Sequence, residues 1–175
     1  MIWNEWTIWN AVVVAFALTA AMGDVRWRKI PRALTTAGLL AGVGFHLYAG
    51  GFNGFALSAL ACLIGFAIGL TFFSLGAIGG GDVKLITALG AMLGLNRWLF
   101  AMEVAVIAAG VIALVQAWRT GRLRQTFANI AETLRWLIAR GVRAHPVINV
   151  SNAAMLRAPF GVAAALGTVA AVIRP

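Results

Sequence analysis

Two aspartates, Asp24 and Asp82, are the residues of this sequence best suited to chemistry. The chain has no other aspartate, and each of the two stands next to an apolar run. An ionisable group at membrane depth is energetically expensive, so each calls for a reason. Two carboxyl groups brought together cannot easily both ionise, so one keeps a proton and the pair can act as base and acid on one water molecule. That is the chemistry of an aspartic peptidase.

Asp82 follows three consecutive glycines, Gly79 to Gly81. Such a run costs conformational entropy and is useful mainly where the backbone bends sharply or another chain approaches closely. Gly79 and Gly81 would let a substrate strand lie against this loop. The alternative is an ordinary turn followed by Asp82 as the N-cap of a helix. A phosphate-binding loop is the weaker interpretation, because the Gly-Lys-Ser/Thr ending of a Walker motif is absent.

Asp24 lies at the start of a basic turn, and a purely structural role is the alternative to a catalytic one. Arg26, Arg28 and Lys29 follow it closely. A carboxylate at a helix end could simply neutralise these charges, although exposed ion pairs contribute little stability. Whether Asp24 meets Asp82 depends on how the helices that carry them pack.

Membrane helices must position both aspartates. Apolar residues make up 62% of the 175 residues and charged residues 11%, whereas about 25% is usual in a soluble domain. A transmembrane helix needs roughly 17 to 25 apolar residues. Six runs are available, at 6–22, 33–48, 55–75, 85–95, 98–117 and 158–173, with turns at 23–32, 49–54 and 96–97. We therefore expect an all-α integral membrane protein, a single bundle of about six transmembrane helices over 1–175, in which the short fourth run takes Asp82, Val83 and Lys84 into its helix.

The longest polar region, Trp118 to Arg157, separates the fifth and sixth runs and carries seven arginines. Its apolar residues recur at helical spacing opposite arginines; they are Leu123, Phe127, Ile130, Leu134 and Ile138. This pattern is typical of a basic amphipathic helix on a membrane surface. It accounts for the excess of basic residues, Lys+Arg 14 against Asp+Glu 5, without a nucleic-acid partner.

The basic residues also predict the orientation in the membrane. Alternating the loops across the bilayer leaves Arg97 and Arg174 on one side and the other 12 on the opposite side. The richer side holds Arg26, Arg28, Lys29, Arg32, Lys84 and the seven arginines of the polar region. Cytoplasmic loops carry the excess of Lys and Arg, so both aspartates are expected at the cytoplasmic face of an inner membrane, and both termini outside.

These features resemble the type IV prepilin peptidases, membrane aspartic peptidases with a Gly-x-Gly-Asp motif. Three pieces match in order: Asp24-Val25-Arg26 with Ile30-Pro31 behind it, Gly79 to Leu85, and more weakly Pro159-Phe160-Gly161. The resemblance covers most of the chain except Trp118 to Arg157. It implies that Asp24 and Asp82 are the catalytic pair of an aspartic-type endopeptidase, which removes the basic leader of pilin-like precursors at the cytoplasmic face.

The residues near the motif carry further implications. Lys84 would tune the electrostatics or contact substrate, and a lysine that snorkels from a helix end is the alternative. Arg32 stands where the family usually has asparagine, which we expect to affect the loop more than the chemistry. Full-length bacterial members carry a cysteine-containing cytoplasmic segment and also methylate the new pilin N-terminus. Here Asp24 follows the first run directly and Cys62 is the one cysteine, which resembles the short, peptidase-only branch of tight-adherence (Flp-type) pilus assembly.

The remaining polar residues suggest neither a metal site nor a cofactor. Glu103 lies within the fifth run, far from the cytoplasmic edge, so it is not expected to join the aspartates. His46 and His145 have no second ligand nearby. Nothing in the sequence indicates an oligomeric state.

Two other functions compete with peptidase activity. A small proton-coupled transporter would use Asp24, Asp82 and Glu103 as carriers, but it predicts acids near the midplane. A non-catalytic subunit of a secretion or pilus assembly would use the basic amphipathic segment to recruit partners or anionic lipid. It leaves the Gly-x-Gly-Asp spacing unexplained.

Overall fold

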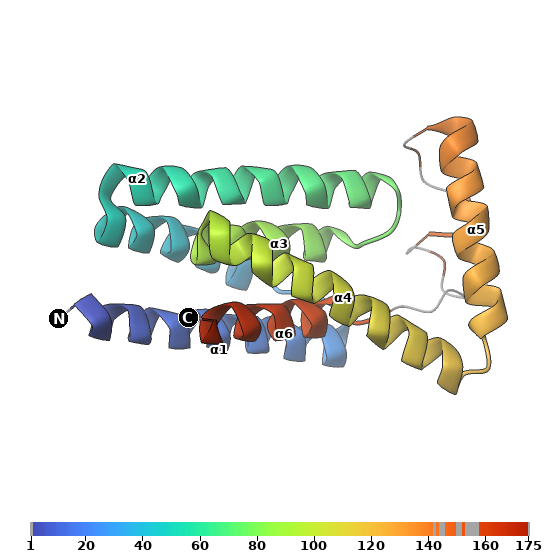
Figure 1. The fold of residues 1–175 in the computed structure, drawn as a ribbon, viewed down its shortest axis with the longest axis horizontal. Coiled ribbons are helices and arrows are strands. Elements are labelled where there is room, and N and C mark those ends of the chain that lie inside the picture. The colour runs from blue at the N-terminus through green and yellow to red at the C-terminus, as the bar shows by residue number, and fades with distance from the viewer. Residues whose placement is uncertain (1, 142, 144–145, 150–151, 153–157, 175) are drawn as a thin grey trace.

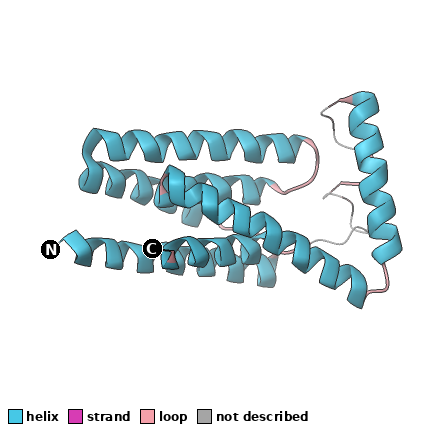
Figure 2. Ribbon diagram, viewed as in Figure 1, coloured by secondary structure: helices cyan, strands magenta, loops and turns pink. Residues whose placement is uncertain are grey.

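The computed structural model of the chain describes residues 2–141, 143, 146–149, 152 and 158–174, and within them it contains helices and no strand (Figure 2). The helices are α1 (Ile2–Trp27), α2 (Arg32–Ser74), α3 (Gly80–Leu93), α4 (Leu95–Arg119), α5 (Leu123–Arg140) and α6 (Phe160–Ile173). The expected all-α architecture is confirmed.

Helix α2 is a hairpin rather than one rod. Its backbone leaves the helical region at Gly51, with φ 57° and ψ −148°, and Figure 1 shows the two limbs running in opposite directions. A positive φ is open to glycine at little cost. The limbs, 32–50 and 52–74, correspond to the second and third expected spans.

Three helices are long and apolar enough to cross a membrane: α1 over Glu5–Trp27, α2 over Arg32–Ser74, and α4 over Leu95–Arg119. At ~1.5 Å per residue, each limb of α2 reaches roughly 28 to 34 Å, which matches a hydrocarbon core of about 30 Å. Helices α3 and α6 have 14 residues each and reach only ~21 Å. These two of the six expected spans are therefore short helices within the bundle.

Large apolar side chains cover the outside of the long helices. Leu40, Leu63 and Ile107 are 65 to 67% exposed. Such surfaces are unfavourable in water and suit a lipid environment. A membrane bundle is thus supported by composition and by the arrangement of the side chains.

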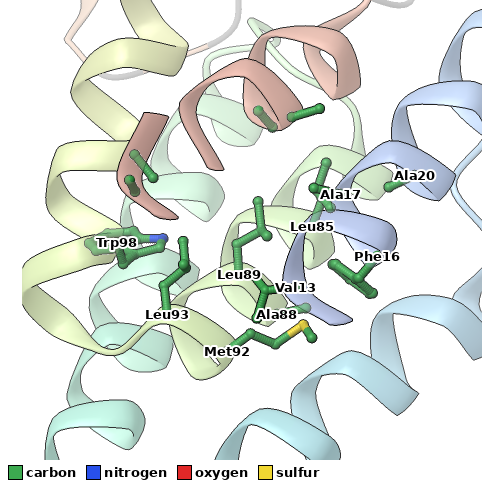
Figure 3. Packing of buried hydrophobic residues seen from close by; sticks show 14 of the residues in the cluster. Val13, Phe16, Ala17, Ala20, Leu85, Ala88, Leu89, Met92, Leu93 and Trp98 are labelled. Atoms are coloured by element: carbon green, nitrogen blue, oxygen red, sulfur yellow. The ribbon is translucent and has the colours of Figure 1, made fainter. Parts of the chain in front are cut away.

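Helix α3 forms the centre of the bundle. From Leu85 to Leu93 all its residues are buried, and Figure 3 shows Leu85, Leu89 and Met92 pointing towards α1. Glycines allow close contact with α2: a Cβ on Gly42 would lie 2.5 Å from the carbonyl carbon of Ala91. Small residues permit this approach between membrane helices.

Buried polar groups are satisfied across helices. The Trp9 indole donates to the carbonyl of Met92 at 3.0 Å, and the Trp98 indole donates to that of Ile86 at 3.1 Å. His46 Nε2 lies 3.1 Å from the same Met92 oxygen. Because that oxygen can only accept, Nε2 carries the proton. These bonds hold α1, the first limb of α2, and α4 against α3.

Two of the expected boundaries are wrong, and so is the alternative that made Asp82 an N-cap. Helix α1 does not end at Met22 but continues through Gly23 and Asp24 to Trp27, because nothing in that stretch breaks a helix. The turn expected at 96–97 lies two residues earlier instead, at Gly94, whose φ of 70° changes the chain direction within one residue. Asp82 is not an N-cap, since α3 begins at Gly80 and its N-cap is Gly79.

The ends of the helices divide between two sides of the bundle. Figure 1 shows the N-terminal end of α1 and the C-terminal end of α6 on one side, and α5 on the other. The end of α1 that carries Asp24 and the beginning of α6 meet at the side of α5, because a hydrogen bond joins Asp24 to Gly161. The expected placement of both chain ends opposite the basic segment agrees with this arrangement.

Candidate active site

Asp24 lies in the last turns of α1 and faces the beginning of α6. Its carboxylate oxygen Oδ2 accepts a hydrogen bond from the backbone N–H of Gly161 at 2.7 Å. Gly161 is the second residue of α6, and a helix N-terminus carries partial positive charge and unpaired N–H groups. The N–H groups and the partial positive charge of this helix end therefore face the carboxyl group of Asp24.

Gly161 leaves no space for a side chain. A Cβ at this position would lie 2.9 Å from the Cβ of Asp24 and 3.0 Å from its Oδ2. In the sequence, Gly161 is only the last residue of the weak third match, and no role is indicated for it. Its contact with Asp24 joins residues 137 positions apart, which no local pattern predicts.

Asp82 lies in the first turn of α3 and is partly buried. Its Oδ2 accepts a hydrogen bond at 2.9 Å from the backbone N–H of Gly79. Burial, opposed by this hydrogen bond and aided by the nearby charge of Asp24, raises the pKa of Asp82 to about 6. Asp82 belongs to none of the three helices that are long enough to cross a membrane.

The two aspartates thus share one electrostatic environment, because the charge of Asp24 is felt at Asp82. Asp24 faces the N-terminus of α6, and burial favours the protonated form of Asp82. An acid and a base on opposite carboxyl groups are what a pair needs to activate water. The structure brings together the two residues that the sequence analysis singled out.

The turn after Asp24 packs against Gly79 to Gly81. We call these three residues the glycine loop, although Gly80 and Gly81 are already the first two residues of α3, where the sequence predicted a loop. A Cβ on Gly81 would lie 3.7 Å from the Cβ of Ile30, so Ile30 covers one side of that loop. Gly23 lies close to the same turn, since a Cβ there would be 3.2 Å from the carbonyl oxygen of Lys29 and 3.7 Å from Pro31. These contacts place Ile30 and Pro31 next to the two segments that carry Asp24 and Asp82.

The fold itself does not require the glycines at 79–81. None of the three has a positive φ. A Cβ on Gly79, Gly80 or Gly81 would meet its nearest neighbour at 3.5 to 3.7 Å, an ordinary van der Waals distance. By contrast, Gly42 and Gly161 are crowded by their own chain. Contacts within the described chain therefore do not require glycine at 79–81, and the role of these residues in substrate binding stays a prediction.

The other polar residues lie apart from the aspartates. Lys84 is exposed, one turn after the beginning of α3. Substrate contact and snorkelling both stay predictions for this side chain. Glu103 is exposed on α4, and His46 packs near Gly94 at the opposite end of α3. His145 lies outside the described residues. Among the described residues, no cluster of His, Cys, Asp or Glu could hold a metal ion.

Comparison with known proteins gives a consistent result. The type IV leader peptidase family matches residues 11–114, a range that includes both aspartates. The chain is similar to a protein described as a prepilin leader peptidase/N-methyltransferase in two strains of Burkholderia pseudomallei, 1026b and K96243. Each is 32% identical over 131 residues, which covers 66% of this chain and 40% of the relative. No solved structure matches.

Proposed function

This chain belongs to the type IV leader peptidase family, and we propose that it is a membrane aspartic endopeptidase that removes leader peptides from prepilins. The observation that supports this most is geometric: the turn after Asp24 packs through Ile30 against Gly81, directly before Asp82. The chain spans 40% of the length of the relatives it matches, so activity and substrate are inferred for this chain rather than carried over.

In the proposed mechanism Asp24 is the base and Asp82 the acid. The Gly161 N–H stabilises the Asp24 carboxylate, which takes a proton from water as the water oxygen bonds to the scissile carbonyl carbon. Asp82, which favours its protonated form, donates its proton to the carbonyl oxygen. The tetrahedral intermediate then collapses, the C–N bond breaks, and the nitrogen leaves as an amine after receiving a proton from the pair. The products are the leader carboxylate and a new N-terminus.

The glycine loop is the proposed substrate platform. An extended precursor would lie against Gly79 and Gly81, and Lys84 would contact it or adjust the local charge. We further propose that the site faces the cytoplasm of the inner membrane, as the charge distribution indicates. We also propose that the chain acts only as a peptidase, without methyl transfer, like the short members of the tight-adherence branch.

The test co-expresses the chain with a Flp-type prepilin and follows leader loss by gel and mass spectrometry. Asp24→Asn and Asp82→Asn keep the size of the side chain and remove the ionisable carboxyl, so each alone is expected to abolish cleavage. Glu103→Gln is the matched control and is expected to cleave like the parent. Cleavage that survives in both aspartate variants, with all proteins inserted, would refute the mechanism.

The transporter alternative receives no support from the site. It requires acids arranged along a path through the membrane, whereas Glu103 is exposed on α4 and the two aspartates lie together at one end. The aspartate variants also separate the recruiting subunit from the peptidase, because that subunit would function without either carboxyl.

A further inference from the structure

Helix α5 has an apolar stripe that the described chain leaves mostly exposed, although Leu123 and Leu137 within it are partly buried. Among the helices it packs only against α4, and it has no buried residue. Phe127 is 58% exposed, Leu134 54% and Ile138 87%. At about 100° of rotation per residue, the stripe is roughly 100° wide; its residues are Leu123, Phe127, Ile130, Leu134, Leu137 and Ile138.

The charged residues of α5 are arranged around this stripe. Arg124 and Arg135 lie about 100° to one side of its centre, and Arg140 lies about 110° to the other. Glu132 lies on the far side, about 170° away. Arginines that flank an apolar stripe can extend towards lipid phosphates while the stripe enters the acyl region. Glu132 therefore lies on the face of α5 that would be turned away from the lipid phosphates.

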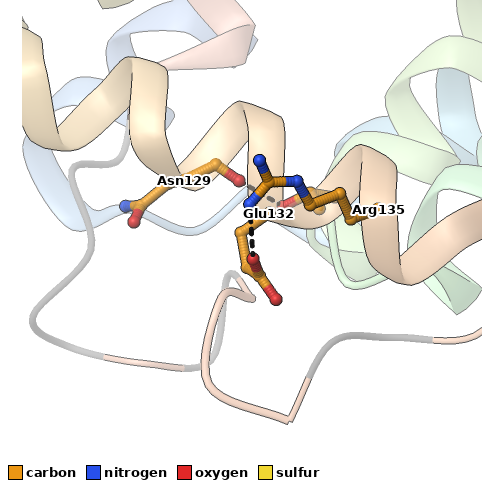
Figure 4. A network of polar contacts seen from close by, with 4 residues as sticks. Asn129, Glu132 and Arg135 are labelled. Atoms are coloured by element: carbon orange, nitrogen blue, oxygen red, sulfur yellow. Dashed lines mark hydrogen bonds and ion pairs between the residues drawn. The ribbon is translucent and has the colours of Figure 1, made fainter.

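The ion pair between Arg135 and Glu132 is too weak to keep Arg135 from binding a lipid phosphate. Figure 4 shows Arg135 reaching Glu132 along the helix, at 3.9 Å between the nearest atoms. Both side chains are exposed, 78% and 50%, so the pair is weak. A guanidinium held so loosely can turn to a stronger anionic partner.

The orientation of α5 also fits a membrane surface. Figure 1 shows α5 lying crosswise to α1, α2 and α6, at the side of the bundle where α1 ends and α6 begins. If the long helices cross the membrane, a crosswise helix at their ends runs along its plane. It then lies at the leaflet nearest to Asp24 and Asp82.

We propose that α5 is an in-plane anchor that binds anionic phospholipid headgroups in the leaflet next to the two aspartates. A second copy of α5 is a poorer occupant of the stripe, because symmetric pairing would bring flanking arginines together. A basic peptide is repelled for the same reason. An anionic lipid surface satisfies both the apolar stripe and its arginine borders.

The experiment uses the full chain in nanodiscs, one copy per disc, in a Cys62→Ser background. An environment-sensitive fluorophore (NBD) is attached to cysteine at Leu134, in the stripe, or at Ala139, on the opposite face. In discs of phosphatidylcholine with phosphatidylglycerol, the label at 134 is expected to shift to the blue and to be quenched by brominated acyl chains. The label at 139 stays in water, and phosphatidylcholine alone or high salt weakens the quenching at 134.

Two variants test the arginines. Each basic residue near an anionic surface is worth roughly fivefold in affinity, so Arg124→Gln with Arg135→Gln is expected to lower the membrane-bound fraction of α5 markedly. Arg124→Lys with Arg135→Lys keeps the charge and is expected to retain it. Equal quenching in both lipids, equal quenching at 134 and 139, or burial of 134 only in discs with two copies would overturn the proposal. None of these readouts depends on peptidase activity.

Discussion

At the scale of single residues, the two carboxyl groups differ because their backbone partners differ. Asp24 accepts from the N-terminus of another helix, α6, whereas Asp82 accepts from Gly79 in its own first turn and is more strongly affected by burial. The two carboxyl groups therefore lie in different surroundings. The sequence shows both aspartates but not this difference, because the partners come from the packed helices.

The raised pKa of Asp82 predicts a pH-dependent stability. A carboxyl whose pKa is about 6 in the folded protein, against 3.8 ordinarily, favours folding below about pH 4 and loses this contribution as the pH rises through 6. Asp82→Asn keeps an acceptor for Gly79 and cannot ionise. Its stability relative to the parent should therefore increase between pH 4 and pH 7.5, by at most about 3 kcal/mol.

The measurement is the thermal unfolding midpoint of both proteins in detergent across this pH range. Glu103→Gln serves as the control. The difference between its unfolding midpoint and that of the parent should not show the pH dependence expected for Asp82→Asn. A constant difference between Asp82→Asn and the parent from pH 4 to 7.5 would contradict the raised pKa.

The glycine loop gives a second prediction at this scale. Gly81→Ala adds a methyl group that the fold accommodates, with its nearest neighbour at 3.7 Å, so stability should stay close to that of the parent. If a substrate strand lies against Gly81, kcat/KM should fall about tenfold or more, which equals ~1.4 kcal/mol of transition-state binding. Leader cleavage of purified protein measures the first quantity and thermal unfolding the second. Unchanged cleavage would exclude close contact at Gly81.

At the scale of elements, close packing between α2 and α3 keeps Asp82 in place. The first limb of α2 contacts the backbone of α3 through Gly42, and the second limb does so through Gly69, where a Cβ would lie 3.2 Å from the Cα of Val83. Val83 directly follows Asp82. The hairpin at Gly51 is what allows both limbs to reach the same short helix.

Gly42 and Gly44 form a matched pair for testing this packing. Gly42→Ala would place a Cβ 2.5 Å from the Ala91 backbone, and overpacking of this kind costs about 1 to 3 kcal/mol. At Gly44 nothing lies within 4 Å, so Gly44→Ala should be neutral or raise stability by up to about 1 kcal/mol. Unfolding in mixed detergent micelles compares the two variants. Equal effects would mean that α2 and α3 do not pack through Gly42.

At the scale of the whole molecule, both ends of the described chain lie on one side and α5 lies on the other (Figure 1). The basic residues follow the same division. Arg97 and Arg174 belong to the first side, where Arg97 donates to Asn10 and stacks over Trp6. The two aspartates therefore lie on the same side of the bundle as α5 and its arginines.

Labelling tests the proposed orientation. In a Cys62→Ser background, a cysteine at exposed Asn53, in the turn of α2, should react with a membrane-impermeant maleimide added to cells with a permeabilised outer membrane. A cysteine at exposed Arg119, at the end of α4, should react only after the inner membrane is opened. The reverse pattern would place the aspartates on the outer face.

The sequence by itself determined the helical segments and their chemistry. Because each backbone group in lipid must be satisfied within its own helix, spans appear as continuous apolar runs, and the turn near Gly51 and the periodic stripe of α5 were readable for the same local reason. Asp24 and Asp82 were also identifiable, since acids beside apolar runs are rare.

Only the tertiary structure decided what these segments meet. The pairing of Asp24 with Gly161, the single-residue turn at Gly94 and the central position of the short α3 all depend on which helix surfaces fit together. Periodicity fixes the face of a helix but not its neighbour, because apolar faces are interchangeable in hydrophobic energy and differ in shape. Close approach at glycines, which is a property of pairs of helices, selects the arrangement that brings the two carboxyl groups together.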